Sequence, residues 1–247
     1  MGIREDLDSS TIRYELRPSV NFIKKTGSGK SVNAKKRVLD GVVPITMKTN
    51  LVYWLVFNGN LFDDSPELIQ AERVEDFDFD ETRLCFEAKS MASIWPKDIA
   101  IYITGQKTVD YLLCSAYYEI VSDRVRNVIE SISKNEVEFL PVKLYQDKNL
   151  EFPEPFWVPN ILCTIDALDW DNTRWISQTP PDRSDPEAYM KIIKPTMRED
   201  KIKYAHMFKI IVQGKIDPEI YLSARLKEAL EMNGCTVGME FTPIKVS

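Results

Sequence analysis

Few residues of this sequence have types and spacings that could do chemistry, and the first such pattern resembles a phosphate-binding loop. The run Gly27–Ser31 ends in Gly-Lys-Ser. That motif needs another glycine at the position of Lys24, because the loop must turn sharply at both ends. No buried strand pattern leads into the run and no helix pattern follows it, so no helix N-terminus is available to bind an anion. We predict a surface loop here.

The second candidate is His206, the single histidine of the chain. A Ser–His–Asp or Cys–His arrangement would have to use it, and the surrounding sequence supplies no recognisable nucleophile. The four cysteines lie far apart and none forms a Cys-x-x-Cys pair, which is typical of reduced core residues rather than a metal site. We therefore expect a half-buried, hydrogen-bonded histidine, no catalytic residue, no metal and no cofactor.

The third candidate is the group Asp166, Asp169 and Asp171, which could coordinate a hard cation or act as a carboxylate pair. The calcium-loop pattern fails, because neither the glycine nor the final glutamate follows at the required distance. Aspartates that cap a turn after a strand are the commoner explanation. One alternative stays open: a small-molecule enzyme whose site lies near Asp166–Asp171 and His206.

Composition narrows the classes of function. The 247 residues are 44% hydrophobic and carry a net charge of −6, which is typical of a folded protein and disfavours direct nucleic-acid binding. The longest apolar run, Leu51 to Phe57, is far shorter than the ~20 residues that a membrane span needs. No apolar signal sequence opens the chain. We expect a soluble, cytoplasmic protein that does not enter a membrane.

An acidic segment runs from Asp63 to Glu81, with nine acidic residues and one basic residue. It is either a solvated face on a half-buried strand or a surface that binds a basic partner. Charge would raise the association rate, and the interleaved aromatic side chains would supply buried contacts. The candidate partner-binding residues are Asp63, Asp64, Glu67, Glu72, Glu75, Asp76, Phe77, Asp78, Phe79, Asp80 and Glu81.

The elements that must position these residues are strands and amphipathic helices without a regular alternation. We predict strands at 51–57, 82–87, 99–104 and 156–165, and helical spacing over 107–116. Such a pattern favours an α+β fold with a mixed sheet packed against a few amphipathic helices.

The C-terminal half contains two similar helix–strand units about a hundred residues apart. Ser122 and Ser223 stand at N-cap positions, and an apolar stripe with helical spacing follows each of them. A turn then leads to a strand in which a proline, Pro141 or Pro243, stands two residues after a phenylalanine. Both helices need a common core to bury their stripes. Chance similarity between two common helix–strand units is the alternative.

In order and spacing, residues 117–244 resemble a family of bacterial immunity proteins that protect producers of polymorphic toxins, the myxobacterial type. The resemblance rests on the two serine-capped helices with their E-F-x-P strands and on the intervening pieces 158–162 and 165–169. Its motif residues, which we regard as structural, are Ser122, Pro141, Asn160, Asp166, Asp169, Ser223 and Pro243.

The resemblance implies a bacterial protein that binds a cognate contact-dependent or secreted toxin and neutralises it by stoichiometric inhibition, without catalysis. Toxins that act on nucleic acids are usually basic, so an acidic partner suits them. We divide the chain into a strand-rich, partner-facing part at 1–116 and an immunity-family-like α+β domain at 117–247. Alternatively, the two parts form one continuous domain.

Overall fold

The computed structural model describes residues 52–57, 71–73, 82–97, 99–103, 110–114, 119–146 and 150–247. All of them belong to one compact unit, Thr46–Ser247, whereas the other unit, Met1–Ile45, lies outside the described residues. The predicted loop at Gly27–Ser31 therefore lies outside the described residues.

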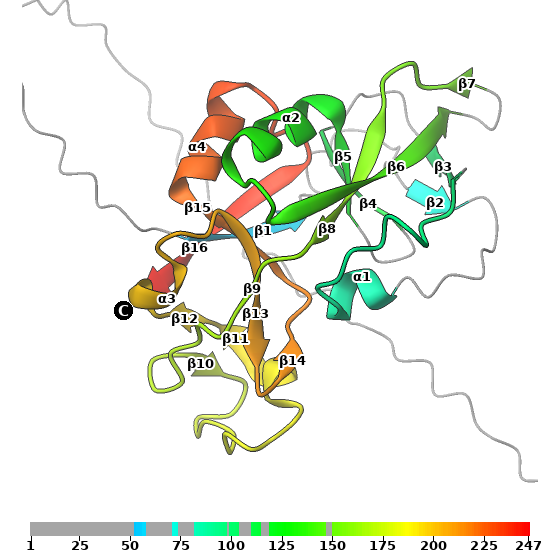
Figure 1. Ribbon diagram of the computed structural model, residues 1–247. Coiled ribbons are helices and arrows are strands. Elements are labelled where there is room, and N and C mark those ends of the chain that lie inside the picture. The colour runs from blue at the N-terminus through cyan, green and yellow to red at the C-terminus, as the bar shows by residue number, and fades with distance from the viewer. Residues whose placement is uncertain are drawn as a thin grey trace, which may run out of the picture. The chain divides into compact units, whose positions relative to one another are not determined.

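Strands dominate the compact unit, and a few helices pack against them (Figure 1). This arrangement confirms the predicted α+β class. The helices are α1 (Thr82–Phe86), α2 (Asp123–Ile132), α3 (Glu199–Ile202), α4 (Ala224–Met232) and the 3-10 helix η2 (Ala188–Lys191).

The first sheet has the strand order β2-β3-β6-β8-β5-β4, with β7 added alongside β6. Its only parallel pair is β3 with β6, and its other pairs are antiparallel. The strands are β2 (Ala71–Arg73), β3 (Ala100–Ile103), β4 (Tyr111–Leu113), β5 (Glu119–Ser122), β6 (Val137–Gln146), β7 (Leu150–Glu151) and β8 (Phe156–Ile161).

The second sheet has the order β12-β16-β1-β15-β13-β14, and β9 pairs in parallel with β13. The pair β12 with β16 is also parallel, and the remaining pairs are antiparallel. The strands are β1 (Val52–Phe57), β9 (Thr164–Ile165), β12 (Thr196–Met197), β13 (Met207–Val212), β14 (Lys215–Ile216), β15 (Ile220–Ser223) and β16 (Met239–Val246).

The two sheets have the same topology in their shared part. The path β3-β6-β8-β5-β4 corresponds strand by strand to β12-β16-β1-β15-β13, with the parallel pair at the same end. The register corresponds as well, because Ser122 pairs with Phe156 in β8 and Ser223 pairs with Val52 in β1. The repeat detected in the sequence therefore extends over most of the compact unit.

The first strand of each repeat lies in the sheet of the other repeat. In chain order, β1 opens the first repeat and β8 opens the second. However, β1 pairs with β15 and β16, whereas β8 pairs with β5 and β6. Each sheet is thus completed by a strand from the other half, and neither half is a closed structure by itself.

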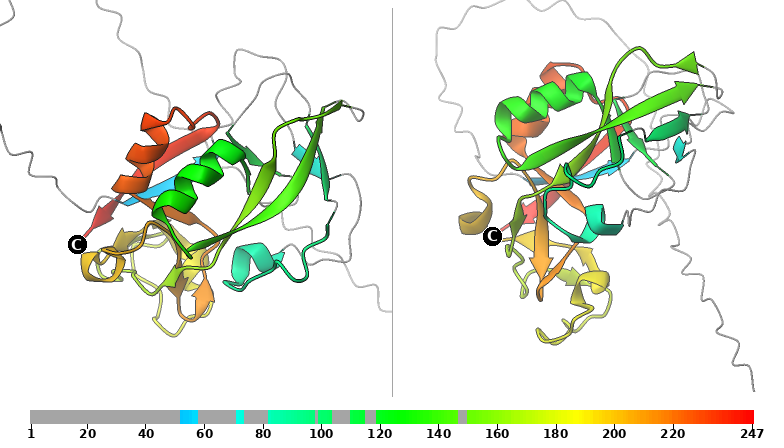
Figure 2. Two further views of the ribbon diagram at one scale, coloured as in Figure 1. Left: turned by 45° about the horizontal axis from the view of Figure 1, so that its top comes forward. Right: turned by 45° about the vertical axis from the view of Figure 1, so that its right-hand side comes forward.

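The helices α2 and α4 begin at the predicted serines. Ser122 Oγ accepts a hydrogen bond from the Val125 N–H at 3.5 Å, and Ser223 Oγ accepts one from the Leu226 N–H at 3.2 Å. The two helices lie side by side (Figure 2) and bury their apolar stripes in one cluster with residues of both sheets. This confirms that the two helices share a core.

Two local predictions are wrong. The segment predicted as a strand at 82–87 contains helix α1. The Arg83 Nε lies 3.2 Å from a carboxylate oxygen of Glu87, the residue that follows the helix. Within the predicted helical segment 107–116, the described residues 110–114 include strand β4, which pairs with β5. Apolar residues at short spacing fit either structure, and tertiary pairing decides between them.

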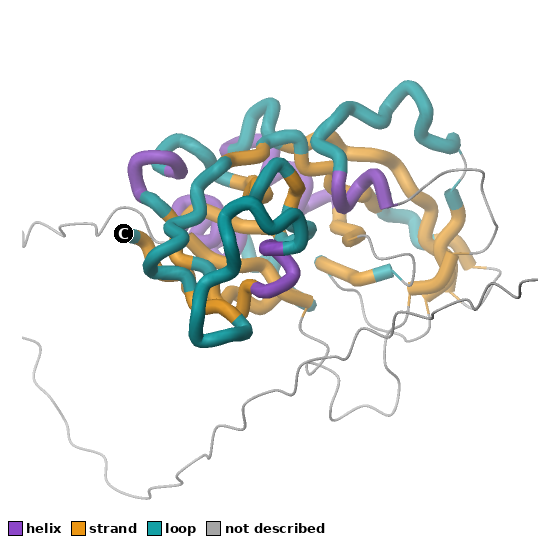
Figure 3. The backbone as a smooth tube through the Cα atoms, turned by 90° about the horizontal axis from the view of Figure 1, so that it is seen from below, coloured by secondary structure: helices purple, strands orange, loops and turns teal. Residues whose placement is uncertain are grey.

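A lobe between β9 and β12 has no counterpart in the described part of the first repeat. It contains the short pair β10 (Arg174–Trp175) and β11 (Ile192–Lys194) together with η2. Figure 3 draws this lobe, seen from below, mostly as loop. Trp170 and Trp175 pack against each other inside it, with ring centroids 4.9 Å apart.

The two halves approach each other closely at Gly238, in the turn before β16. Its φ is +95°, and a Cβ at this position would lie 2.3 Å from the backbone oxygen of Tyr111. Gly234, in the turn after α4, also has a positive φ of +61° but has no atom within 4 Å of the corresponding Cβ position. Of the three glycines in the described residues, Gly238 is therefore the one that close packing between the halves requires.

We expect Gly238→Ala to destabilise the protein by more than about 3 kcal/mol, because it adds a backbone clash to the strain of positive φ. The control Gly234→Ala has the strain alone and should cost about 1 kcal/mol. Urea unfolding of both variants measures the two values. Equal losses would show that the contact between the halves relaxes freely.

Candidate functional site

The single histidine belongs to a polar contact that occurs once in each repeat. His206 Nδ1 lies 2.9 Å from Ser223 Oγ, and Asp110 Oδ1 lies 3.0 Å from Ser122 Oγ. Asp110 and His206 hold equivalent positions, just before β4 and β13. In both repeats the side chain orients the hydroxyl of the serine that caps the following helix. The Ser–His pair thus has a structural explanation.

The same region joins the two halves through reciprocal hydrogen bonds. The Glu136 carboxylate, in the turn before β6, accepts the backbone N–H groups of His206 and Met207 at 3.1 and 2.9 Å. The buried Asp110 carboxylate accepts a hydrogen bond of 3.1 Å from the backbone N–H of Val237, which lies in the turn before β16. It also accepts two hydrogen bonds from Arg124, at 2.6 and 2.8 Å. These carboxylates hold the halves together.

The aspartates near residue 170 behave as turn residues. Asp169 accepts hydrogen bonds from the backbone N–H and the side-chain Nδ2 of Asn172, at 3.1 and 2.9 Å. The side-chain hydrogen bond from Asn172 lowers the pKa of Asp169 most strongly. Asp171 is exposed and pairs with Arg183 at 3.2 Å. This matches the expected turn-capping role of Asp169.

The structure does not bring these aspartates and the histidine into one site. In the parallel pair of β9 and β13, Ile165 is level with Ile210. Asp166 is consequently five positions beyond His206 along the strand direction, about 16 Å at ~3.3 Å per residue. Among the described residues, no group of three or more histidine, cysteine, aspartate or glutamate side chains could hold a metal ion.

The remaining motif residues lie within strands. Asn160 in β8 is fully buried and donates through Nδ2 to Glu138 Oε2 at 3.0 Å and to the Lys89 carbonyl at 2.9 Å. Glu138 also accepts the Met91 N–H at 2.7 Å, so these contacts fix residues 89–91 on the first sheet. Pro141 and Pro243 are exposed at corresponding positions of β6 and β16.

A buried group of charged residues escaped the sequence analysis. Lys209 is 4% exposed, and its Nζ donates to the carbonyls of Leu84 and Cys85 at 2.8 and 3.1 Å, at the C-terminal end of α1. Asp217 is equally buried, and burial raises its pKa to about 6. Burial raises the pKa of Glu119 as well. The sequence signal that could have indicated this buried charge is Lys209 itself, a lysine inside the apolar run 207–212.

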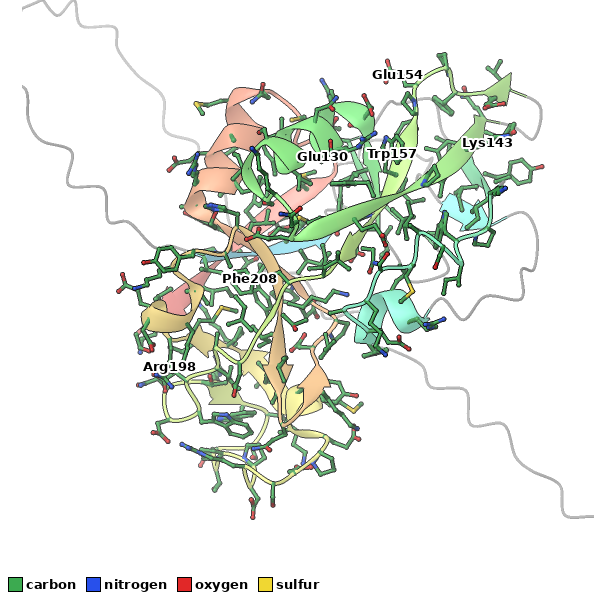
Figure 4. The ribbon with its side chains drawn as sticks, viewed as in Figure 1. Glu130, Lys143, Glu154, Trp157, Arg198 and Phe208 are labelled. Atoms are coloured by element: carbon green, nitrogen blue, oxygen red, sulfur yellow. The ribbon has the colours of Figure 1, made fainter. Side chains whose placement is uncertain are left out.

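Each repeat places a cation over aromatic rings on the helix-bearing side of its sheet. The Arg126 guanidinium lies 4.0 Å from the ring centre of Trp157 and 5.9 Å from that of Phe139. Its Nε lies 3.0 Å from a carboxylate oxygen of Glu130. Figure 4 shows Glu130 and Trp157 at this position beside α2.

The second repeat has the equivalent cluster around Lys227 of α4. The Lys227 Nζ lies 5.0 Å from the ring centre of Tyr53 and 5.5 Å from that of Phe241, and it pairs with Glu231 at 2.6 Å. In both clusters one aromatic ring comes from the exchanged strand. Such contacts contribute roughly 0.5–1 kcal/mol each at exposed sites.

The acidic candidate residues are almost all outside the described residues. Glu72 is the exception, because it lies in β2, where its backbone pairs with Tyr102 in β3. The other candidates lie outside the description: Asp63, Asp64, Glu67, Glu75, Asp76, Phe77, Asp78, Phe79, Asp80 and Glu81.

Comparison with known proteins identifies the class of this protein. Residues 63–246 match the Immunity protein family (Imm11), so the chain belongs to this family of immunity proteins and has a toxin as its partner. This confirms the resemblance found in the sequence. A comparison with curated protein sequences gave no match. Within the described residues, no helix is both long enough and apolar enough to span a membrane.

We expect Asp217→Asn to change the pH dependence of stability. Because the pKa of Asp217 is raised to about 6 in the folded state, its stabilising contribution is complete below pH 3.8 and is lost as pH rises through 6. The variant removes this loss and should gain up to about 3 kcal/mol over the wild type at pH 7.5, but little at pH 4. The Asn amide oxygen still accepts the Glu219 N–H, which bonds to Asp217 at 2.9 Å.

Urea unfolding at both pH values measures the difference. The control is Asp182→Asn, at an exposed carboxylate whose pKa is lowered by the backbone N–H of Ser184. Its pH effect should have the opposite sign. A gain for Asp217→Asn that is the same at pH 4 and 7.5 would contradict the burial of a titrating carboxylate.

Proposed function

We propose that this protein binds a cognate bacterial toxin and neutralises it by stoichiometric inhibition in the cytoplasm. Membership of the Immunity protein family over residues 63–246 is the observation that carries this proposal. An inhibitor of this kind needs a complementary surface and no catalytic group.

The placement of the polar residues supports a binding function over the enzyme alternative. His206 and Asp110 orient capping serines, and Asp169 closes a turn. The alternative enzyme site would require Asp166–Asp171 and His206 to converge, but the aspartates follow β9 whereas His206 precedes β13, which separates Asp166 from His206 along the strand direction. These residues are used to build the scaffold.

The distribution of charge supports a basic toxin. Residues 63–81 carry nine acidic residues and one basic residue, a net charge of −8, whereas the whole chain carries −6. The rest of the chain is therefore net +2. Negative charge is concentrated in this single stretch of sequence, which would steer a basic partner toward it.

The first test of the proposal uses the C-terminal domain of a toxin, which we expect the reading frame upstream of this gene to encode. We expect the two proteins to co-purify as a complex of fixed stoichiometry, which calorimetry measures. Co-expression should restore growth to cells that produce the toxin domain, because the inhibitor blocks the toxin directly. Cells that die equally fast with and without this protein would refute the proposal.

The second test reverses charge within the acidic segment. Six substitutions to lysine should slow association with the toxin domain by at least about tenfold at low salt, because they remove electrostatic steering. Stopped-flow kinetics over a range of salt concentrations measures the effect. The substituted residues are Asp63, Asp64, Glu75, Asp76, Asp78 and Asp80.

The control carries the same change in net charge at six exposed acidic residues elsewhere on the compact unit. It should retain most of the wild-type association rate at 150 mM salt, where charges act over only about 8 Å. Equal slowing in both variants would show that the acidic segment has no special part in steering. The control residues are Asp166, Asp171, Asp182, Asp200, Glu228 and Glu240.

A further inference from the structure

Among the described residues, α2 covers only part of one face of the first sheet. Along β6, the residues Leu140, Val142 and Leu144 point into the core and are buried. The alternate residues point to the opposite face, on which α2 packs near Phe139. Farther along the same face, Pro141 and Lys143 are exposed. Helix α2 therefore covers only part of this side of the sheet.

The open part carries a row of aromatic and basic side chains, which we call the β6 face. Across the sheet, Pro141 pairs with Trp157, and Tyr145 pairs with Tyr102. Lys143 lies in β6 between these two pairs. It is two residues beyond Pro141, the β6 residue that pairs with Trp157 (Figure 4). The β6 face consists of Tyr102, Pro141, Lys143, Tyr145 and Trp157.

The aromatic rings of the β6 face are held in fixed orientations. The rings of Tyr102 and Tyr145 meet edge to face, with centroids 6.1 Å apart, and the Tyr145 hydroxyl donates to Glu151 at 3.3 Å. The Trp157 Nε1 donates to Asp123 at 3.0 Å, and Arg126 covers its ring. Half-exposed aromatic side chains with little remaining freedom are typical anchors of protein–protein interfaces.

The fold does not require this row, as the second repeat demonstrates. Pro243 and Lys245 in β16 are exposed at the positions equivalent to Pro141 and Lys143. Two residues farther along the chain, however, Ser247 stands where the first repeat has Tyr145. Directly after the neighbouring strand β12, the position equivalent to Tyr102 is Arg198, which pairs with Asp200. The tyrosine pair is therefore an addition to the shared scaffold.

The chemistry of the occupant follows from what adjoins the β6 face. Strand β2 (Ala71–Arg73) pairs with β3 and sets the backbone of Glu72 opposite Tyr102. Carboxylates also adjoin the face: Glu151 accepts a hydrogen bond from the Tyr145 hydroxyl, and Asp123 accepts one from Trp157 Nε1. A basic protein surface complements this combination, because these carboxylates attract it and the aromatic rings contact it.

We infer that the β6 face is the surface that contacts the cognate toxin, and that it binds a basic patch on the toxin domain. The inference rests on the proposed function. Aromatic rings beside lysine and arginine also occur in single-strand nucleic-acid binding sites. The adjoining negative charge opposes a phosphate backbone, so a protein partner is favoured.

The experiment compares matched substitutions in the two repeats, using the full chain and the upstream-encoded toxin domain. Lys143→Glu and Lys245→Glu make the same charge change at equivalent exposed positions. Lys143→Glu should accelerate association about threefold at 150 mM salt, because it adds negative charge where the basic partner docks, while Lys245→Glu should leave the rate unchanged. Surface plasmon resonance measures both rates.

Tyr145→Ala tests the aromatic contact separately. It should raise the dissociation rate about tenfold, the effect of losing one interfacial anchor. Thermal unfolding that matches the wild type shows that the variant is folded, and Tyr204→Ala is the control, because Tyr204 is 81% exposed and lies after α3.

The outcomes separate this inference from the proposed function. A wild-type chain that fails to bind the toxin domain overturns both. A wild-type chain that binds and neutralises, while Lys143→Glu matches Lys245→Glu and Tyr145→Ala matches Tyr204→Ala, overturns the β6 face alone. Binding of a short single-stranded oligodeoxythymidylate that is abolished by Lys143→Glu, with toxin binding unchanged, would assign the face to nucleic acid instead.

Discussion

The compact unit depends on one constraint: each of the two long helices can bury its apolar stripe only in a core to which both halves contribute. The buried stripe residues Val125 and Ile129 of α2 lie in the same cluster as Leu226 and Leu230 of α4. The exchange of β1 and β8 strengthens this dependence, because each sheet loses a central strand if the halves separate. At roughly 25 cal/mol per Å² of apolar surface, exposure of this core would cost each half much of its stability.

The features that the sequence predicted are those determined locally. Ser122 and Ser223 cap helices through hydrogen bonds to residues three positions later, so the signal and the structure lie within one turn. The strand at 51–57 is similarly recognisable from its continuous apolar run, and β1 occupies 52–57 of it. The predicted turn role of Asp169 rests on the nearby Asn172, and the structure contains this contact. The α+β class follows from such elements together.

The features that could not be predicted depend on partners that are distant in sequence. Helix α1 was predicted as a strand, and a lysine more than a hundred residues away bonds to its final carbonyl groups. The cation–aromatic clusters escaped detection for the same reason, since Trp157 and Tyr53 arrive on exchanged strands. The spacing of residues in a single sequence does not predict which strand will pair into which sheet.

Comparison of the two repeats separates scaffold from function. Asp110 and His206 differ in chemistry, but each orients the serine that caps the following helix. Because both repeats contain this contact, we regard it as a structural feature of the fold. Lys143 and Lys245 are both lysines at equivalent exposed positions, but only Lys143 has a tyrosine pair beside it. The tyrosine pair is half-exposed, and the second copy of the scaffold folds without one. We therefore assign the pair to contact with another molecule, which is the property that an immunity protein needs.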